Sequence, residues 1–196
     1  MKKMACLYGI KKYVVKFDPK KSLYYGLNPS IMSLDYLPYY STIDDPVIKD
    51  IARQLNEQIE IDDVFYRATV ALALVQQNIK YVSDESRFGR DVWELPIYTV
   101  TERMADCDGM ASLYTSIAYN MGIDVITVVV TGHMLSAVCL RGHGKYYEYD
   151  GKKYYHMETT AKLPAAGRYW DNPETYCMAE PLVPIDEFRS MLSYKI

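Results

Sequence analysis

Hydrophobic periodicity predicts two helices before residue 80. Asp45 suits the N-cap of the first helix and Pro46 suits its first turn, and the apolar positions that follow share one face: Ile48, Ile51, Ala52 and Leu55. A second helix is predicted from residue 62 or 63 to residue 78. Its buried stripe steps by three and four, as expected for a helix that packs on a core: Phe65, Ala68, Leu72, Val75 and Ile79.

A third helix is predicted to begin after Asp106, which can cap it, and to stop at Gly122. Its apolar face consists of Met110, Leu113, Tyr114, Ile117 and Met121. The period then changes from helix to strand. Successive strands are predicted over residues 123–130, 134–140, 145–150 and 152–158, with Asp150–Gly151 as a tight turn between the last two. Helices followed by a meander of strands indicate an α+β fold.

The first part of the chain gives weaker patterns. Residues 1–43 contain short tyrosine-rich pieces punctuated by Pro29 and Pro38. We therefore expect residues 1–43 to form an irregular N-terminal arm that wraps the core, and residues 44–196 to form the domain itself. Residues 81–96 are expected to be a loop that ends at Pro96.

Composition narrows the class of protein. With 196 residues, 49% hydrophobic and 24% charged, the chain is expected to be one globular domain. A formal charge of −3 disfavours nucleic acid and membrane surfaces as partners. The apolar stretches near the N-terminus are interrupted by lysines, so no signal peptide is predicted and a cytoplasmic location is expected. The four cysteines form no CxxC pair, so free thiols are expected: Cys6, Cys107, Cys139 and Cys177.

Cys107 is the cysteine whose position suggests chemistry. It falls in the first turn of the third predicted helix, where unpaired N–H groups and the helix dipole favour a thiolate over a thiol. A thiolate is the nucleophilic form, so Cys107 is a candidate nucleophile. The alternative at this stage is a small buried hydrophobe, which is what most free cysteines are.

A base and an acid follow Cys107 along the chain. His133 begins a predicted strand after Thr131–Gly132, and Glu158 ends a later strand. A histidine next to the cysteine helix can accept the thiol proton, and a carboxylate can hold the imidazole in the required tautomer. The other two histidines are weaker candidates for the base. His143 lies in a predicted exposed turn, and His156 lies in a predicted strand, in the core or at the edge of the sheet. Asp150 is the alternative acid.

Together these residues resemble the transglutaminase-like superfamily of papain-like thiol enzymes, and more closely its small archaeal and bacterial cysteine peptidases. The resemblance runs from about Asp45 and rests on four segments: VQQNIKYVSDE, WELPIYTVTERMADCDGMA, the Gly132–His133 pair, and YDGKKYY followed by Glu158–Thr159–Thr160. The residue before the Asp-Cys pair is alanine here, where the family usually has glycine. The resemblance implies a papain-like core with the nucleophile helix packed on an antiparallel sheet.

The same resemblance implies that Cys107 is the nucleophile, His133 the base and Glu158 the third member of a triad. The backbone N–H of Cys107 is one oxyanion candidate. The second donor in the superfamily is an upstream side chain, for which Gln76, Gln77 and Trp93 are available.

No metal and no cofactor are expected. Some superfamily members bind calcium, and Asp84, Glu85 and Asp91 lie close together in the sequence. Because they match no EF-hand spacing, a solvated loop is the preferred interpretation. Cys139 and His143 lack the second ligand pair of a zinc site.

The predicted function is thiol-dependent acyl transfer on an amide or isopeptide bond of a protein or peptide substrate. Hydrolysis is favoured, as in a peptidase, isopeptidase or deamidase. The alternatives are an amine-dependent crosslinking transglutaminase and a non-catalytic binding module on the same fold. The sequence leaves the substrate and the oligomeric state open.

Overall fold

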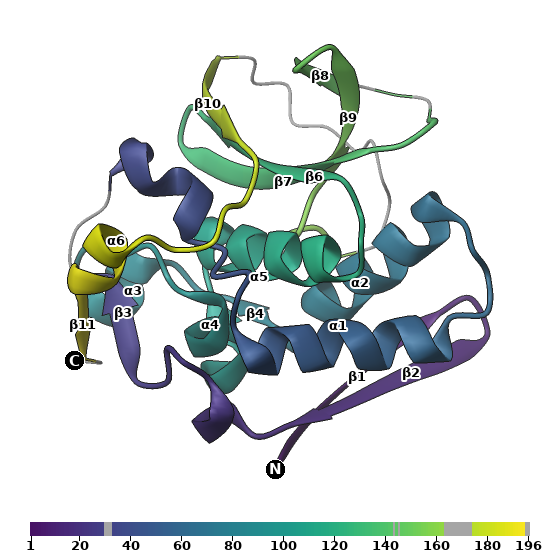
Figure 1. The fold of residues 1–196 in the computed structure, drawn as a ribbon, viewed down its shortest axis with the longest axis horizontal. Helices are drawn as coiled ribbons and strands as arrows, with labels where there is room; N and C mark the ends of the chain where they lie inside the picture. Colours follow the sequence, from purple (N-terminus) through teal and green to yellow (C-terminus); the bar gives the residue numbers. More distant parts are fainter. Residues whose placement is uncertain (30–32, 143, 145, 163–173, 195–196) are drawn as a thin grey trace.

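The computed structural model describes residues 1–29, 33–142, 144, 146–162 and 174–194. Within these residues the largest sheet has five antiparallel strands in the order β10-β6-β7-β9-β8. The strands are β6 (Val125–Val130), β7 (His133–Cys139), β8 (Tyr146–Tyr149), β9 (Lys152–Met157) and β10 (Thr175–Ala179). Figure 1 shows this sheet curled above helix α5 (Cys107–Asn120). The predicted α+β class is confirmed, and so are the four strands between residues 123 and 158.

Helix α5 is the central element of the core. Its residues from Asp108 to Ala118 are buried, because β6 and β7 cover one side of the helix and other helices cover the rest. Thr115 Oγ1 lies 2.8 Å from Ser136 Oγ of β7, and Ser136 Oγ donates to the carbonyl oxygen of Ala111 at 3.1 Å. These buried polar groups satisfy one another, so they fix the position of α5 along β7 without an unpaired hydroxyl.

Three more helices surround α5: α1 (Pro46–Gln58), α2 (Val64–Asn78) and α4 (Pro96–Glu102). The first two confirm the sequence prediction, including the Asp45 cap, whose carboxylate accepts the N–H of Val47. Asp63 caps α2 by accepting the N–H of Tyr66. Helix α4 was not predicted. Pro96 begins this helix instead of closing a loop, as its fixed φ and missing N–H permit. The expected loop also contains α3 (Asp84–Phe88) and overlaps β4 (Lys80–Tyr81), which pairs in parallel with β5 (Met104–Ala105).

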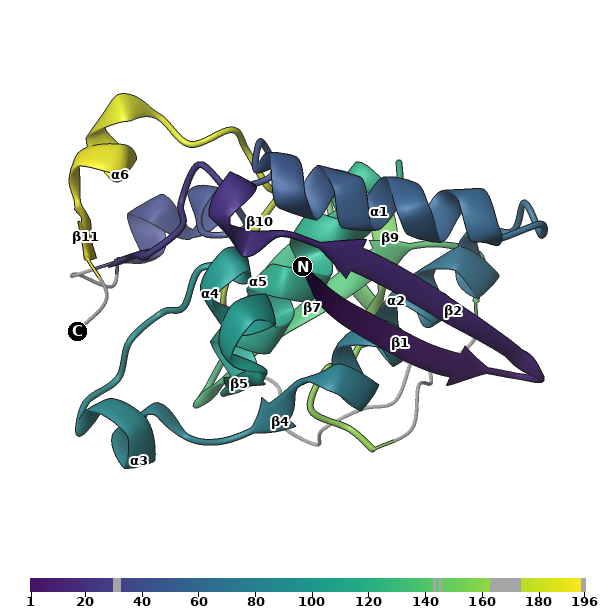
Figure 2. The same cartoon turned by 90° about the horizontal axis from the view of Figure 1, so that it is seen from below.

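The N-terminal segment corrects the prediction of an irregular arm. Residues 1–17 form a hairpin of β1 (Lys2–Tyr8) and β2 (Lys11–Phe17), which Figure 2 shows lying along α1 and α2. Alternate side chains of the hairpin enter the main core: Met4, Cys6, Tyr13, Val15 and Phe17. The alternation was hidden in the sequence because lysines flank each short apolar run.

Both outer edges of the hairpin are covered by amide side chains. On α2, Gln77 and Asn78 exchange hydrogen bonds with the backbone of β1 at Leu7 and Ala5. On α1, Gln54 and Gln58 do the same for β2 at Lys16 and Val14. Edge strands expose unpaired backbone groups that could pair with another chain. Here the helices satisfy these groups and thereby attach the hairpin to the body.

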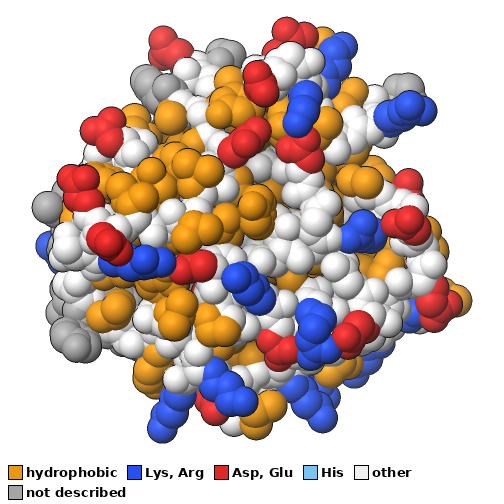
Figure 3. Space-filling model, in the orientation of Figure 1, with side chains coloured by type: hydrophobic (Ala, Val, Ile, Leu, Met, Phe, Trp, Pro, Cys, Tyr) orange, Lys and Arg blue, Asp and Glu red, His pale blue; other side chains and the backbone are white. Residues whose placement is uncertain are grey.

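The remaining elements lie at the opposite end of the molecule from the hairpin loop. They are η1 (Pro19–Lys21), β3 (Leu27–Pro29), η2 (Leu34–Tyr39), α6 (Asp186–Ser190) and β11 (Leu192–Tyr194), and β11 pairs with β3. On the face in Figure 3, apolar side chains gather over η2 and the chain between β10 and α6, whereas charged groups of both signs are scattered over the rest of the face. Among the described residues, no helix has both the length and the apolar character of a membrane span.

The packing of the hairpin predicts unequal effects for two of its apolar side chains. Phe17→Ala should lower the free energy of unfolding by about 3–5 kcal/mol, because Phe17 is 2% exposed within the core. Leu7→Ala on the same hairpin should change it by less than about 0.5 kcal/mol, because Leu7 is 58% exposed. Urea denaturation of both variants checks this. Equal, small effects would mean that the hairpin is a peripheral arm.

Candidate active site

Cys107 is the first residue of α5, as predicted, and Asp106 is its N-cap, with the carboxylate accepting the N–H of Asp108. Gly109 allows this turn to pack closely. A Cβ there would lie 2.9 Å from both Ala105 Cβ and Thr99 Oγ1, and 3.0 Å from Glu94 Oε2. Glycine in a helix costs about 1 kcal/mol relative to alanine. At this position it lets α5 approach its neighbours and holds the cysteine turn in place.

Cys107 and His133 line the same cavity. Its wall also includes aromatic, apolar and acidic residues: Tyr81, Asp91, Trp93, Asp106, Asp108, Val129, Val130, Gly132 and Met134. Cys107 is half-buried, and 16% of the His133 side chain is exposed. The cavity therefore brings two of the predicted site residues to one solvent-accessible place.

His133 and Glu158 form a direct pair. Gly132 has a φ of +68°, which favours glycine, and this turn starts β7 with His133 as its first residue. His133 Nε2 lies 2.9 Å from Glu158 Oε2. The other carboxylate oxygen of Glu158 accepts the N–H of Thr160 at 2.9 Å and its hydroxyl at 2.6 Å. The backbone oxygen of Glu158 accepts from Gln76 Nε2 at 2.7 Å, so the carboxylate and its main chain are both held.

The surroundings of Glu158 keep it ionised. Burial alone would raise its pKa, but the hydrogen bonds from His133 and Thr160, together with the nearby imidazole of His156, outweigh burial and lower the pKa well below the ordinary value of a glutamate. Glu158 is therefore a fixed negative charge beside the imidazole of His133.

The expectation of a low pKa for the Cys107 thiol was wrong. Burial and the nearby negative charge of Asp106 raise the pKa of Cys107 to about 12, although the backbone N–H groups of Met134 and Cys107 itself act in the opposite direction. The helix N-terminus is present as predicted, but the two flanking aspartates and burial outweigh it.

The oxyanion candidates divide into two groups. The backbone N–H of Cys107 and the side chain of Trp93 are at the cavity, where Trp93 packs edge-to-face on Tyr40 with ring centroids 4.7 Å apart. Gln77 is not brought to the site, because both of its amide atoms bond the backbone of Leu7 in the hairpin. Gln76 contacts the site indirectly, through the backbone of Glu158.

The residues that the sequence left as weaker candidates for the base and the acid are His156, His143 and Asp150. His156 is 1% exposed and its Nε2 lies 3.5 Å from Glu158 Oε2, so it is a core residue beside the acid. His143 lies outside the described residues. Asp150 is exposed in the β8–β9 turn with a φ of +46°, as the turn prediction required, and does not line the cavity.

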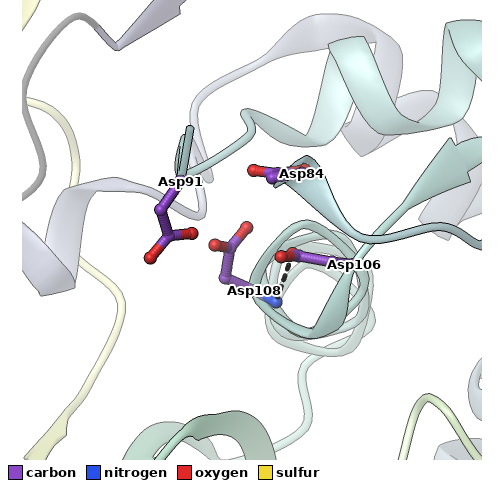
Figure 4. Close-up of side chains that lie close together, drawn as sticks. All are labelled: Asp84, Asp91, Asp106 and Asp108. Carbon is purple, nitrogen blue, oxygen red and sulfur yellow. Dashed lines mark hydrogen bonds between the residues drawn. The ribbon is translucent and has the colours of Figure 1, made fainter. Parts of the chain in front are cut away.

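Four aspartates converge next to Cys107. The sequence pointed to Asp84 and Asp91 as neighbours, but it did not predict that Asp106 and Asp108 join them. Figure 4 shows the carboxylates of Asp84, Asp91, Asp106 and Asp108 facing a common space, and one oxygen from each lies within 4.8 Å of the others. Asp84 is 2% exposed, so the expectation of a solvated loop was wrong for this residue. Glu85, the third acid of that loop, is exposed and outside the cluster. The signal available in the sequence was the Asp106–Cys107–Asp108 triplet after an acidic segment.

Negative charge exceeds positive charge around this cluster. Buried Glu94 adds a fifth carboxylate, and Arg87 is the guanidinium that faces it, with Nη1 2.7 Å from Glu94 Oε2 and 3.7 Å from Asp84 Oδ1. Burial first, then the charge of Asp106, raises the pKa of Asp84 to about 7, and burial raises the pKa of Glu94 to about 8. The pKa values of Asp106 and Asp108 are raised as well, mainly by burial. One arginine does not balance these groups.

The donor set fits a hard divalent cation. Asp84 Oδ1 is buried and accepts no hydrogen bond among the described residues, and Arg87 at 3.7 Å is too distant to donate one. Calcium binds carboxylate oxygens at about 2.3–2.6 Å, so ligands on opposite sides of the ion are about 5 Å apart. The spacing of the four carboxylates matches this size.

Comparison with known proteins gives a likeness in fold. No family model matches the sequence, and no curated protein matches it either. Among solved structures, the chain is similar to "a Putative Cysteine Protease from Cytophaga hutchinsonii", with a TM-score of 0.50 and 11% identity. The two chains share a fold. The aligned part covers 83% of this chain and 51% of that one, so this chain spans about half the length of that protein.

The lowered pKa of Glu158 predicts a pH-dependent contribution to stability. A carboxylate with a depressed pKa in the folded state stabilises the protein above its unfolded pKa, about 4.3, and this contribution is lost as the pH falls further. Glu158→Gln should therefore lower the free energy of unfolding by about 1–3 kcal/mol at pH 7. The difference from wild type should shrink below about pH 4. Denaturant titrations across this range check it, with exposed Glu148→Gln as the control that should change little. A difference that is constant with pH would contradict the assigned ionisation.

The aspartate cluster predicts stabilisation by a divalent cation. Calcium at about one hundred times its dissociation constant should add about 2.7 kcal/mol, which corresponds to a rise in melting temperature of about 5 °C or more. Asp91→Asn should reduce this rise, whereas Glu85→Gln, an acid of the same segment outside the cluster, should retain it. Thermal unfolding of metal-free protein with and without calcium, magnesium or manganese measures the effect. An equal response of the two variants would show that the cluster holds no cation.

Proposed function

We propose that this protein is a thiol-dependent amide hydrolase with a transglutaminase-like, papain-like core. The observation that carries the proposal is the 2.9 Å contact of His133 with the buried carboxylate of Glu158, in the cavity that Cys107 lines from the first turn of α5. The likeness in fold to a protein described as a cysteine protease supports the same class of chemistry. Cys107 is the proposed nucleophile, His133 the base and Glu158 the orienting acid.

The two ring nitrogens of His133 have different proposed roles, which the contact with Glu158 supports. Nε2 faces Glu158, so Nδ1 is the atom through which His133 exchanges a proton with the thiol. The sulfur of Cys107 attacks the substrate carbonyl carbon while its proton passes to Nδ1 of His133. The imidazolium then protonates the leaving amine, and a thioester on Cys107 remains.

Water completes the cycle. His133 removes a proton from a water molecule, the hydroxyl attacks the thioester carbon, and the acid product leaves as the thiol of Cys107 is restored. The fixed negative charge of Glu158 favours the imidazolium in both halves of the reaction. The raised pKa of Cys107 means that the resting thiol is protonated, so this mechanism depends on the base rather than on a preformed thiolate.

The hydrogen-bond donors to the oxyanion and the cluster of four aspartates complete the proposed site. The backbone N–H of Cys107 and the indole of Trp93 are the proposed donors to the oxyanion. If calcium is bound, as in some superfamily members, the four clustered aspartates would hold it. Its charge would offset the carboxylates on both sides of the nucleophile.

The reaction products distinguish hydrolysis from the alternatives. We propose a protein or peptide as the substrate. A library of synthetic peptides that contain glutamine and lysine, incubated with an added primary amine, reports all three reactions by mass spectrometry. Peptide-bond cleavage adds water across the bond, deamidation replaces an amide NH₂ with OH, and crosslinking joins the amine with loss of ammonia. Cleavage or deamidation is the expected result.

Substitutions test the assigned residues in the same assay. Cys107→Ala should abolish turnover, and His133→Ala should reduce it by about 10²-fold or more while the protein still folds. Cys139→Ser is the matched control, because Cys139 is another half-buried cysteine on β7, outside the cavity. Turnover that survives Cys107→Ala would refute the proposal. A folded wild-type protein that converts none of the peptides would instead indicate a binding module.

A further inference from the structure

The second histidine beside the acid has a role that the proposed mechanism leaves unexplained. His156 and Glu158 are two residues apart along one extended segment, so their side chains point to the same face of the sheet. His156 Nε2 lies 3.5 Å from Glu158 Oε2, the same oxygen that His133 contacts at 2.9 Å. Glu158 Oε2 therefore lies between two imidazoles, one that lines the cavity and one that is buried.

His156 is buried beside the carboxylate oxygen that His133 contacts. It is 1% exposed, and among the described residues neither ring nitrogen makes a regular hydrogen bond. Its ring packs edge-on against Tyr147, with centroids 6.3 Å apart. A neutral ring has one N–H, and Glu158 Oε2, 3.5 Å from Nε2, is an acceptor toward which it can point.

We propose that His156 is a positioning residue for the site: its neutral imidazole directs the Nε2 N–H at Glu158 and shares the charge of that carboxylate with His133. The inference rests on the proposed function for its catalytic consequence. Thr160 already holds the other oxygen of Glu158, so His156 adjusts how strongly the carboxylate attracts the proton of His133. A carboxylate that receives a further hydrogen bond is a weaker partner for the imidazolium, so His156 lowers the affinity of His133 for its proton.

This arrangement suits a base that must release the proton again. If His133 held the proton too tightly, transfer to the leaving amine would become slower, since proton transfer is most efficient when the base titrates near the working pH. The titratable side chains around the shared oxygen are His133 from β7 and His156 from β9, with the ring of Tyr147 from β8 against His156.

The first test uses the unaltered protein. In nitrogen-labelled wild-type protein, NMR should show His156 as the neutral tautomer with the proton on Nε2 across the range in which His133 titrates. The chain has three histidines, and His133→Gln and His156→Gln assign their signals. A proton on Nδ1 of His156, or a ring that becomes charged together with His133, would overturn the proposal without reference to any variant's folding.

The second test uses three variants. His156→Phe keeps the ring but removes its nitrogens, and the pKa of His133 should rise by about 0.5 unit or more. His156→Gln retains an N–H near the Nε2 position and should restore a value close to wild type. Tyr154→Phe is the control, because it removes a hydroxyl from the same face of β9 where that hydroxyl contacts Asp124. An unchanged His133 titration in His156→Phe, or equal shifts in the Phe and Gln variants, would refute the role.

The same variants separate this inference from the proposed function. In the peptide assay, His156→Phe should lower kcat several-fold with little change in KM, and His156→Gln should recover kcat. If the wild type shows no turnover that depends on Cys107, the proposed function fails, while the NMR titration still decides whether His156 modulates His133. If turnover is present but the titrations are insensitive to His156, the inference fails alone.

Discussion

Thr115 on α5 and Ser136 on β7 contact each other inside the core, and Ser136 also donates to the backbone of Ala111. In a buried region a hydroxyl without a partner costs free energy, so α5 cannot slide along β7 without breaking this set. The register that it fixes places the first turn of α5 beside the start of β7. Cys107 and His133 occupy these two ends, and their shared cavity depends on this contact.

The sheet supplies the remaining part of the site through its own pairing. Ser136 of β7 is opposite Met157 of β9, so Glu158 follows directly after the paired part of the strand. Alternation along β9 then places His156 on the same face as Glu158. One strand therefore provides both the carboxylate and the buried imidazole that accompanies it, and the neighbouring strand provides the histidine at the cavity.

Burial and electrostatics around Cys107 oppose ionisation of its thiol. The helix N-terminus favours a thiolate, but Asp106 and Asp108 flank Cys107 and both are largely buried. Asp84 and Asp91 bring two further carboxylates from the segment that precedes α4. Ionisable groups with strongly shifted pKa values are typical of functional sites. Around Cys107 two influences on the thiol therefore oppose each other, the helix N-terminus and the clustered carboxylates.

The sequence determined the elements whose signals come from near neighbours. Helices α1, α2 and α5 and strands β6–β9 follow from periods of three to four and of two, and Asp45, Asp63 and Asp106 cap their helices as short-range chemistry requires. The tertiary structure decided what depends on distant partners. The hairpin of residues 1–17 is stable because α1 and α2 cover it, and Gln77 is used there instead of at the cavity. The aspartate cluster and the contact of His156 with Glu158 likewise come from packing, because burial and charge are properties of the folded surroundings and local sequence does not encode them.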